Sequence, residues 1–268
     1  MLALTLALGT GCNKLRARDQ LNKGVNAYKN GHYEQAIQYF SKAVEYDNKL
    51  GVARLYLATA YVGQYVPGVD TPENNRSAEQ AIEQYQAVLN EPNVKEQTKI
   101  TALKGIASLY FNEKKFDQAK EFHHKVLEVD PSDPETYYSI GVIDWSQTYQ
   151  PRMALYNSKG IKPDEPLKDK KDCADLAEKN QANVDDGIKM LDQAIKLRKD
   201  YDDAMAYLNL MYREKASIDC DDPEERQADL KTADDWVEKT MATKRAKAEK
   251  QNRQGGIVLD QNQQPQQQ

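Results

Sequence analysis

Residues 24–48 read GVNAYKNGHYEQAIQYFSKAVEYDN, and this stretch decides the fold. Small residues stand at Gly24 and Ala36, where two helices must approach each other closely. Phe40 follows Ala36 one helical turn later, so a bulky side chain shares its face with a small one. Gly31 marks the turn, because glycine adopts a positive φ at little cost. The pattern predicts a hairpin of two helices.

The hairpin resembles a tetratricopeptide repeat, a helix–turn–helix unit of 34 residues. The residues that match the signature positions of that family are Gly24, Tyr33, Ala36, Phe40 and Ala43. Asn48 stands where the family usually has proline. A second uninterrupted copy ends at Asp130-Pro131. The resemblance implies an all-α fold, a TPR-type helical-hairpin solenoid of about five repeats over residues 17–245.

Three of the five repeats carry insertions between their two helices. Residues 64–76 interrupt the second repeat with prolines that cannot continue a helix, Pro72 among them. Residues 146–182 interrupt the fourth, and their middle predicts a long polar loop of a kind that is often functional. Alternatively, the part from Lys171 onward extends the following helix backwards. An acidic break, residues 218–225, interrupts the fifth.

Both ends of the chain differ from the solenoid, which we expect over residues 13–248. Residues 1–12, MLALTLALGTGC, are too short an apolar run to span a bilayer and predict a signal peptide. Their end resembles a bacterial lipobox, which implies that Cys12 is lipidated, although Gly9 stands where leucine is usual. The alternative is a buried N-terminal helix with an incidental thiol. Residues 249–268 are glutamine-rich and predict a disordered tail.

Composition and motifs argue against catalysis and against nucleic acid as a partner. The net charge is -5, and charged residues make up 29% of the chain. The sequence has no HExxH, CxxC, GxSxG or phosphate-binding glycine loop. His123 and His124 are adjacent and cannot form the i, i+4 pair that a metal needs. We therefore predict no catalytic residue, no cofactor and no metal.

What remains is a surface for binding proteins. In the family that the chain resembles, the first helices of successive repeats line the concave face. That resemblance implies a groove for peptide or helical segments of partner proteins, lined by Tyr28, Lys29, Leu55, Lys104, Phe111, Asn112, Tyr138 and Trp145. The alternative for the aromatic members is that they merely pack between repeats.

The two remaining cysteines, Cys173 and Cys220, are an even count once Cys12 carries lipid. Both fall in insertions on the same edge of the solenoid, which predicts a disulfide between them in an oxidising compartment. The alternative is two free thiols in mobile loops.

These expectations together describe an exported, membrane-anchored scaffold without catalytic activity. Asn13 is not aspartate, which favours an outer-membrane lipoprotein facing the periplasm within an envelope assembly complex. The alternatives are a soluble cytoplasmic adaptor of the same fold and an enzyme whose site lies in the insertion at residues 146–182.

Overall fold

The computed structural model describes residues 8–163 and 165–255. These residues form ten α-helices and no strand, and successive helices pair into five hairpins. The chain divides into two compact units, unit 1 (Met1–Pro131) and unit 2 (Ser132–Gln268). The all-α fold of five helical hairpins, predicted from the sequence, is confirmed.

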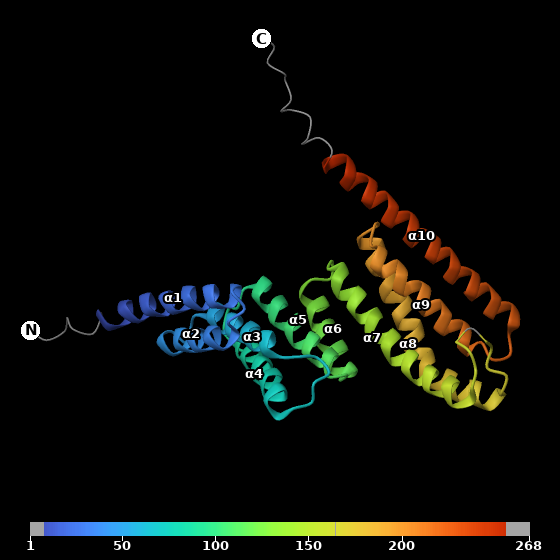
Figure 1. Cartoon of the computed structure of the whole chain (residues 1–268), viewed down its shortest axis with the longest axis horizontal. Helices are drawn as coiled ribbons and strands as arrows, with labels where there is room; N and C mark the ends of the chain where they lie inside the picture. The colour runs from blue at the N-terminus through green and yellow to red at the C-terminus, as the bar shows by residue number, and fades with distance from the viewer. Residues whose placement is uncertain (1–7, 164, 256–268) are drawn as a thin grey trace, which may run out of the picture. The chain divides into compact units, whose positions relative to one another are not determined.

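Unit 1 contains three hairpins, whose helices follow one another in chain order (Figure 1). They are α1 (Leu8–Lys29) with α2 (Tyr33–Tyr46), α3 (Gly51–Gln64) with α4 (Pro72–Leu89), and α5 (Glu96–Asn112) with α6 (Phe116–Val129). The second helix of each hairpin also packs on the first helix of the next, α2 on α3 and α4 on α5. Consecutive hairpins of unit 1 therefore pack against one another, as in repeat proteins generally.

The first hairpin shows why its small and bulky residues alternate. Phe40 is fully buried on α2 and lies against the backbone of α1 at Gly24. A Cβ atom added to Gly24 would come within 2.4 Å of the Phe40 ring, so no larger residue fits without a shift. Gly31 forms the turn with a φ of +76°. Both roles match those predicted from the sequence.

The insertion of the second repeat is shorter than predicted. Pro72 does not interrupt a helix but begins α4, a position where its missing N–H costs nothing. The connection is only the loop of residues 65–71, which the buried side chain of Asn74 holds in place. Asn74 accepts from the Val66 N–H at 2.7 Å and donates to the Val66 and Val69 carbonyls at 3.0 and 2.7 Å.

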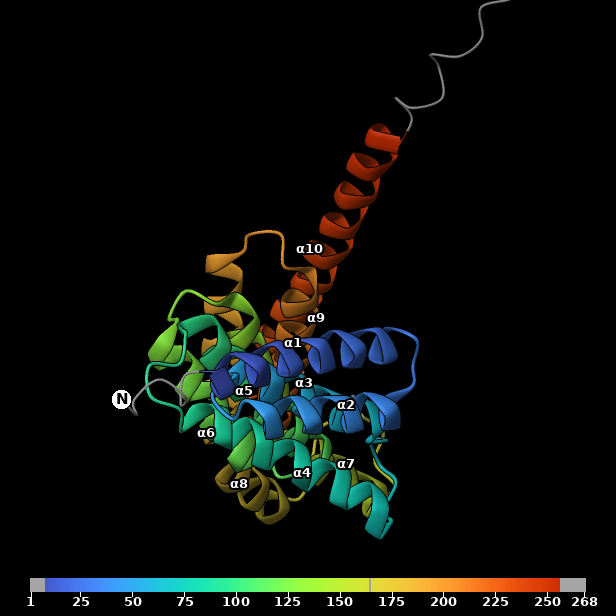
Figure 2. The ribbon, with the colours of Figure 1, turned by 90° about the vertical axis from the view of Figure 1, so that its left-hand side faces the viewer.

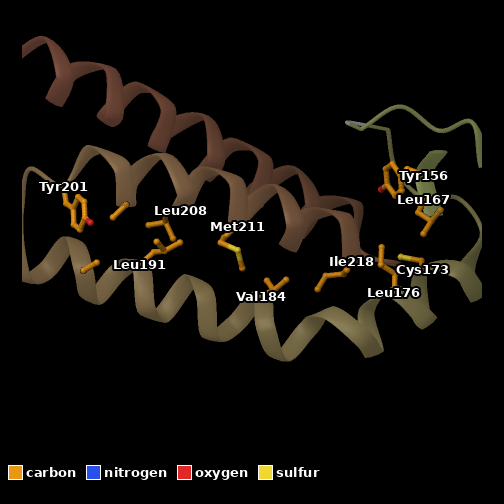
Figure 3. Packing of buried hydrophobic residues seen from close by; sticks show 12 residues of the cluster. Tyr156, Leu167, Cys173, Leu176, Val184, Leu191, Tyr201, Leu208, Met211 and Ile218 are labelled. Carbon is orange, nitrogen blue, oxygen red and sulfur yellow. The ribbon is translucent and has the colours of Figure 1, made fainter. Parts of the chain in front are cut away.

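Unit 2 contains two longer hairpins, α7 (Pro134–Lys159) with α8 (Lys170–Leu197), and α9 (Asp202–Ile218) with α10 (Pro223–Gly255). Helix α8 packs against both α7 and α9, and α10 packs against α9. Figure 3 shows the apolar core between α8 and α9, where Val184 and Leu191 face Leu208 and Met211.

The polar loop predicted for the middle of the fourth-repeat insertion is present but shorter than predicted, and most of the insertion around it is helical. Helix α7 continues to Lys159, and α8 begins at Lys170, so the insertion mainly lengthens both helices. Only residues 160–169 connect them, beginning at Gly160 with a φ of +66°. The structure supports the alternative that the residues from Lys171 onward extend the second helix of the repeat, α8, backwards. Pro151 lies inside α7, although its ring is usually a helix breaker.

The fifth hairpin and the ends of the chain also depart from the prediction. The acidic break is a short connection of residues 219–222. Helix α10 continues past the other helices of unit 2 to Gly255 (Figure 2). Residues 249–255, predicted to be disordered, are therefore helical, because their lysine, glutamate and glutamine residues favour a helix. The rest of the predicted tail, and residues 1–7 of the predicted signal peptide, lie outside the described residues.

Helix α1 already begins at Leu8, so the part of the expected signal segment that is described, which includes Cys12, is helical. Among the described residues, no helix combines the length and the apolar character needed to cross a membrane.

Candidate functional site

The eight residues predicted to bind a partner all lie on the first helices of their hairpins. Helices α1, α3 and α5 carry six of them in unit 1, and α7 carries Tyr138 and Trp145 in unit 2. Each unit therefore presents its own set.

In unit 1 the aromatic members of the set contact their own hairpin. The half-buried ring of Tyr28 lies 5.3 Å from that of Tyr33, across the turn from α1 to α2. Phe111 lies 5.8 Å from Phe116 across the turn from α5 to α6. Leu55 packs against the apolar core formed by α3, α4 and α5, whereas Lys29 is exposed. Internal packing thus accounts for part of the surface of each of these aromatic rings.

Asn112, at the end of α5, lines a surface depression of about 530 Å³. The depression is also lined by Tyr65 and Val69 from the loop of residues 65–71, and by Glu113 and Lys115 after α5. Lys104 lies further back on α5 and is half-buried. The structure thus places Asn112 beside the loop of the second repeat, a neighbour that the sequence did not predict.

Unit 2 brings Tyr138 and Trp145 together with three further aromatic residues. We call this group the aromatic strip, and it consists of Tyr138, Trp145, Tyr149, Tyr201 and Tyr207. The Tyr207 ring of α9 lies edge-on to Tyr138 at 5.6 Å and to Trp145 at 5.4 Å. Tyr149 stacks on Trp145 at 4.8 Å, and Tyr201 lies 5.1 Å from Tyr138.

The sequence contained part of the signal for this strip. Tyr138, Trp145 and Tyr149 are seven and four residues apart, a spacing that puts them on one face of a helix. Tyr207 comes from the first helix of the fifth repeat, where the repeat signature is weakest, and was missed for that reason. Tyr201 lies just before α9 and has no periodic signal.

Burial raises the pKa values of two phenols in the middle of the strip, those of Tyr138 and Tyr207. Burial, assisted by Tyr207 and by the carboxylates of Asp203 and Glu135, raises the pKa of Tyr138 to about 12. Burial also raises the pKa of Tyr207, and Asp203 adds to the rise from one turn away on α9. The strip is therefore a surface of neutral aromatic rings bordered by negative charge.

Two arginines of the chain lie at the two ends of the strip. The guanidinium of Arg198 lies 4.3 Å from the centre of the Tyr201 ring and donates to Glu135 at 2.6 Å. At the other end, the guanidinium of Arg152 lies 5.6 Å from the centre of the Tyr149 ring. In both cases a cation lies over an aromatic ring, an arrangement stabilised by the negative face of the ring.

Arg152 also forms a buried ion pair with Glu214. Its Nε and Nη2 atoms each donate to one carboxylate oxygen of Glu214 at 2.8 Å. Its Nη1 atom donates to the Pro163 carbonyl at 3.1 Å, so one side chain links α7, the α7–α8 loop and α9. The Glu214 side chain is 1% exposed and that of Arg152 7%. Two polar residues of the 146–182 insertion thus stabilise the fold: Arg152, and Asn180, which donates to the Thr148 carbonyl.

The structure joins Cys173 and Cys220 in a disulfide, with their Cα atoms 5.6 Å apart. Cys173 lies in the first turn of α8 and Cys220 in the connection between α9 and α10, so the bond links the fourth hairpin to the fifth. Beside it, Leu167 and Pro223 line a depression of about 290 Å³. Cys12, by contrast, is exposed on α1 with a free thiol.

We predict that the isolated protein is oxidised at this position. Non-reducing peptide mapping should recover the Cys173 and Cys220 peptides as one cross-linked species, which separates after reduction. Cys12 should label with a thiol reagent unless it carries lipid, and so serves as the internal control. Quantitative labelling of Cys173 and Cys220 in freshly isolated, unreduced protein would contradict the prediction.

Within residues 12–163 and 165–253, no group of three or more His, Cys, Asp or Glu side chains could hold a metal ion. One carboxylate is nonetheless perturbed: burial, together with the neighbouring Asp229, raises the pKa of Asp219 to about 6. Lys215 donates to Asp229 at 2.7 Å, and its positive charge opposes part of the rise in the pKa of Asp219. This group lies at the start of α10, away from the aromatic strip.

Comparison with known proteins agrees with the hairpin architecture. Models of the tetratricopeptide repeat match residues 17–50 and residues 105–133. These are the first hairpin and most of the third. A search of the curated protein sequences finds no match.

Several solved structures share the fold at low sequence identity. A crystal structure of MamA has a TM-score of 0.56 and 14% identity, over 93% of this chain and 98% of the other. MamA from Desulfovibrio magneticus RS-1 has a TM-score of 0.55 and 16% identity, over 86% and 96%. YrrB, described as a TPR protein with an unusual peptide-binding site, has a TM-score of 0.50 and 13% identity, over 85% and 90%. The chain therefore contains two tetratricopeptide repeats, and its five helical hairpins share the fold of these solved structures.

Proposed function

We propose that the protein is a non-catalytic scaffold that binds peptide or helical segments of partner proteins on the first helices of its hairpins. The observation that carries this proposal is the aromatic strip of unit 2. Four of its five rings, all except that of the buried Tyr201, are only partly covered by the protein, although aromatic side chains gain most from full burial. Half-covered tyrosine and tryptophan residues are typical of the residues that dominate protein interfaces.

The comparison with YrrB supports a peptide as the partner. That protein is described as having a peptide-binding site, and it shares the fold of this chain. In both units of this chain, the predicted residues that remain half-buried or exposed lie on the first helices, where such a segment could contact several hairpins at once. The site in unit 1 would include Phe111, Asn112 and the depression beside them.

The first test replaces the aromatic anchors. We expect Trp145→Ala to weaken the capture of partners from detergent-solubilised membranes by on the order of 2 kcal/mol, because a buried aromatic contact is lost. Phe111→Ala is the equivalent change in unit 1. Binding to partners first identified with the wild-type protein should be measured, together with the circular dichroism melting curve of each variant.

The matched control is Trp145→Phe, which keeps an aromatic ring at the same position and should retain most of the binding. If Trp145→Ala and Phe111→Ala both fold and capture partners as the wild type does, the partner uses another surface and the proposal is wrong.

We also propose that the protein is exported and anchored to a membrane through lipid on Cys12, facing the periplasm within an envelope assembly complex. The support is the lipobox-like sequence before Cys12 and the exposure of that residue on α1. The disulfide between Cys173 and Cys220 also supports export, because such bonds form and persist in oxidising compartments.

Palmitate labelling tests the anchor. We expect the label to be incorporated into the wild-type protein and into Cys173→Ser, the matched control, but not into Cys12→Ser. Intact-mass analysis should show the loss of residues 1–11 and the addition of lipid. Recovery of an unmodified chain beginning at Met1 would instead favour the soluble cytoplasmic adaptor.

A further inference from the structure

The aromatic strip contains a repeated arrangement of ring, carboxylate and arginine. At one end, Arg198 lies over the Tyr201 ring and pairs with Glu135. At the other end, Arg152 lies over the Tyr149 ring and pairs with Glu214. In each case the ring stabilises the flat face of the guanidinium, and the carboxylate neutralises its charge.

The middle of the strip has the aromatic rings and the carboxylate of this arrangement. Tyr207 lies edge-on to both Tyr138 and Trp145, with interplanar angles of 80° and 81°. Asp203 precedes Tyr207 by four residues and therefore lies on the same face of α9. Its carboxylate is close enough to both phenols to raise their pKa values.

The third part, the cation, is missing in the middle. No lysine or arginine of the described residues lies over the rings of Tyr138, Trp145 or Tyr207. Asp203 is exposed and forms no ion pair with any residue in the described part of the chain. Its neighbour Asp202, by contrast, is paired with Lys247.

We infer that this middle section binds an arginine side chain from a segment of a partner protein. The inference rests on the proposed function and specifies the partner of the same site. The guanidinium would lie against the rings of Trp145 and Tyr207 and would pair with Asp203, as the chain's own arginines do at both ends of the strip. Arginine fits better than lysine because its planar fork can both stack on a ring and bind a carboxylate. The acidic net charge of the chain, -5, favours a basic segment as well.

Fluorescence of Trp145 tests this inference directly. The chain has two tryptophans, and Trp236→Phe removes the other, which lies on α10. The probe is a ten-residue peptide of Gly, Ser and Pro with two central arginines. Its twin carries citrulline at both positions, which keeps the shape of the side chain and removes its charge. We expect the arginine peptide to change the Trp145 emission and to bind at least about tenfold more tightly than the citrulline peptide at low salt.

Asp203 provides the decisive variants. Asp203→Asn should reduce the preference for arginine over citrulline to about threefold or less, and Asp203→Lys should abolish binding of the arginine peptide. The matched control is Asp235→Asn, which removes an exposed carboxylate on α10 and should leave the preference unchanged. Melting curves verify that each variant is folded.

Equal binding of the arginine and citrulline peptides, or an unchanged preference in folded Asp203→Asn, overturns the inference. So does the absence of binding by the arginine peptide to the wild-type protein. The proposed function then stands if Trp145→Ala still loses the natural partner, and it fails separately if Trp145→Ala captures that partner normally.

Discussion

Glu214→Gln should lower the free energy of unfolding of unit 2 by about 3–5 kcal/mol. The substitution keeps the shape of the side chain but leaves the guanidinium of Arg152 buried without its counter-charge. Removing one partner of a buried pair costs much more than the pair contributes, because the remaining charge has lost both water and its partner. Thermal and urea unfolding followed by circular dichroism measure the loss.

The comparison that isolates this effect is Glu121→Gln. It breaks the pair with Lys125 on α6, at 2.6 Å, where both side chains are largely exposed. We expect that change to cost about 0.5 kcal/mol or less. The double variant Arg152→Met with Glu214→Leu should recover much of the lost stability, because it removes both charges together. Glu214→Gln with wild-type stability would show that the pair is solvated in solution.

Phe40→Ala should destabilise unit 1 by about 3–5 kcal/mol, since it empties a fully buried site between α1 and α2. The contact of Phe40 with Gly24 permits a sharper test. Gly24→Ala alone should also destabilise, because its methyl group would overlap the Phe40 ring. Combined with Phe40→Leu, the same alanine should cost less than it does alone, which a double-mutant cycle measures.

Tyr46→Ala is the control for Phe40→Ala within the same helix. Tyr46 is 38% exposed, and its loss should cost much less. Additive effects of Gly24→Ala and Phe40→Leu would mean that the two residues do not constrain each other, contrary to the packing of the first hairpin.

The sequence predicted the architecture well where local and tertiary signals agree. Gly24, Gly31 and Phe40 fit both the helical spacing of the sequence and the packing of the hairpin. The first repeat could therefore be recognised from its residues. The repeat signature stops near Trp145, so residues 146–159 were assigned to an insertion although they continue the helix. The ion pair of Arg152 with a residue 62 positions away stabilises a helix there, and no local pattern reports such a contact.

The candidate site was predictable only in part, for a similar reason. Tyr138 and Trp145 could be placed on one face of a helix from their spacing. Their neighbour Tyr207 belongs to a different repeat, and its edge-on contact with both depends on how α9 packs beside α7. In unit 1, Asn112 was predicted but its neighbours were not, because the loop of residues 65–71 is positioned by the side chain of Asn74.

The bond between Cys173 and Cys220 has a consequence for how the end of the solenoid loses structure. In a repeat array, the terminal hairpin has a neighbour on one side only and is normally the first part to fray. Here the terminal hairpin, α9 and α10, is covalently fastened to the one before it. While that bond is intact, the two hairpins stay tethered at this point even when the contacts between α8 and α9 are lost, so a loosened hairpin remains close to its neighbour and can pack on it again.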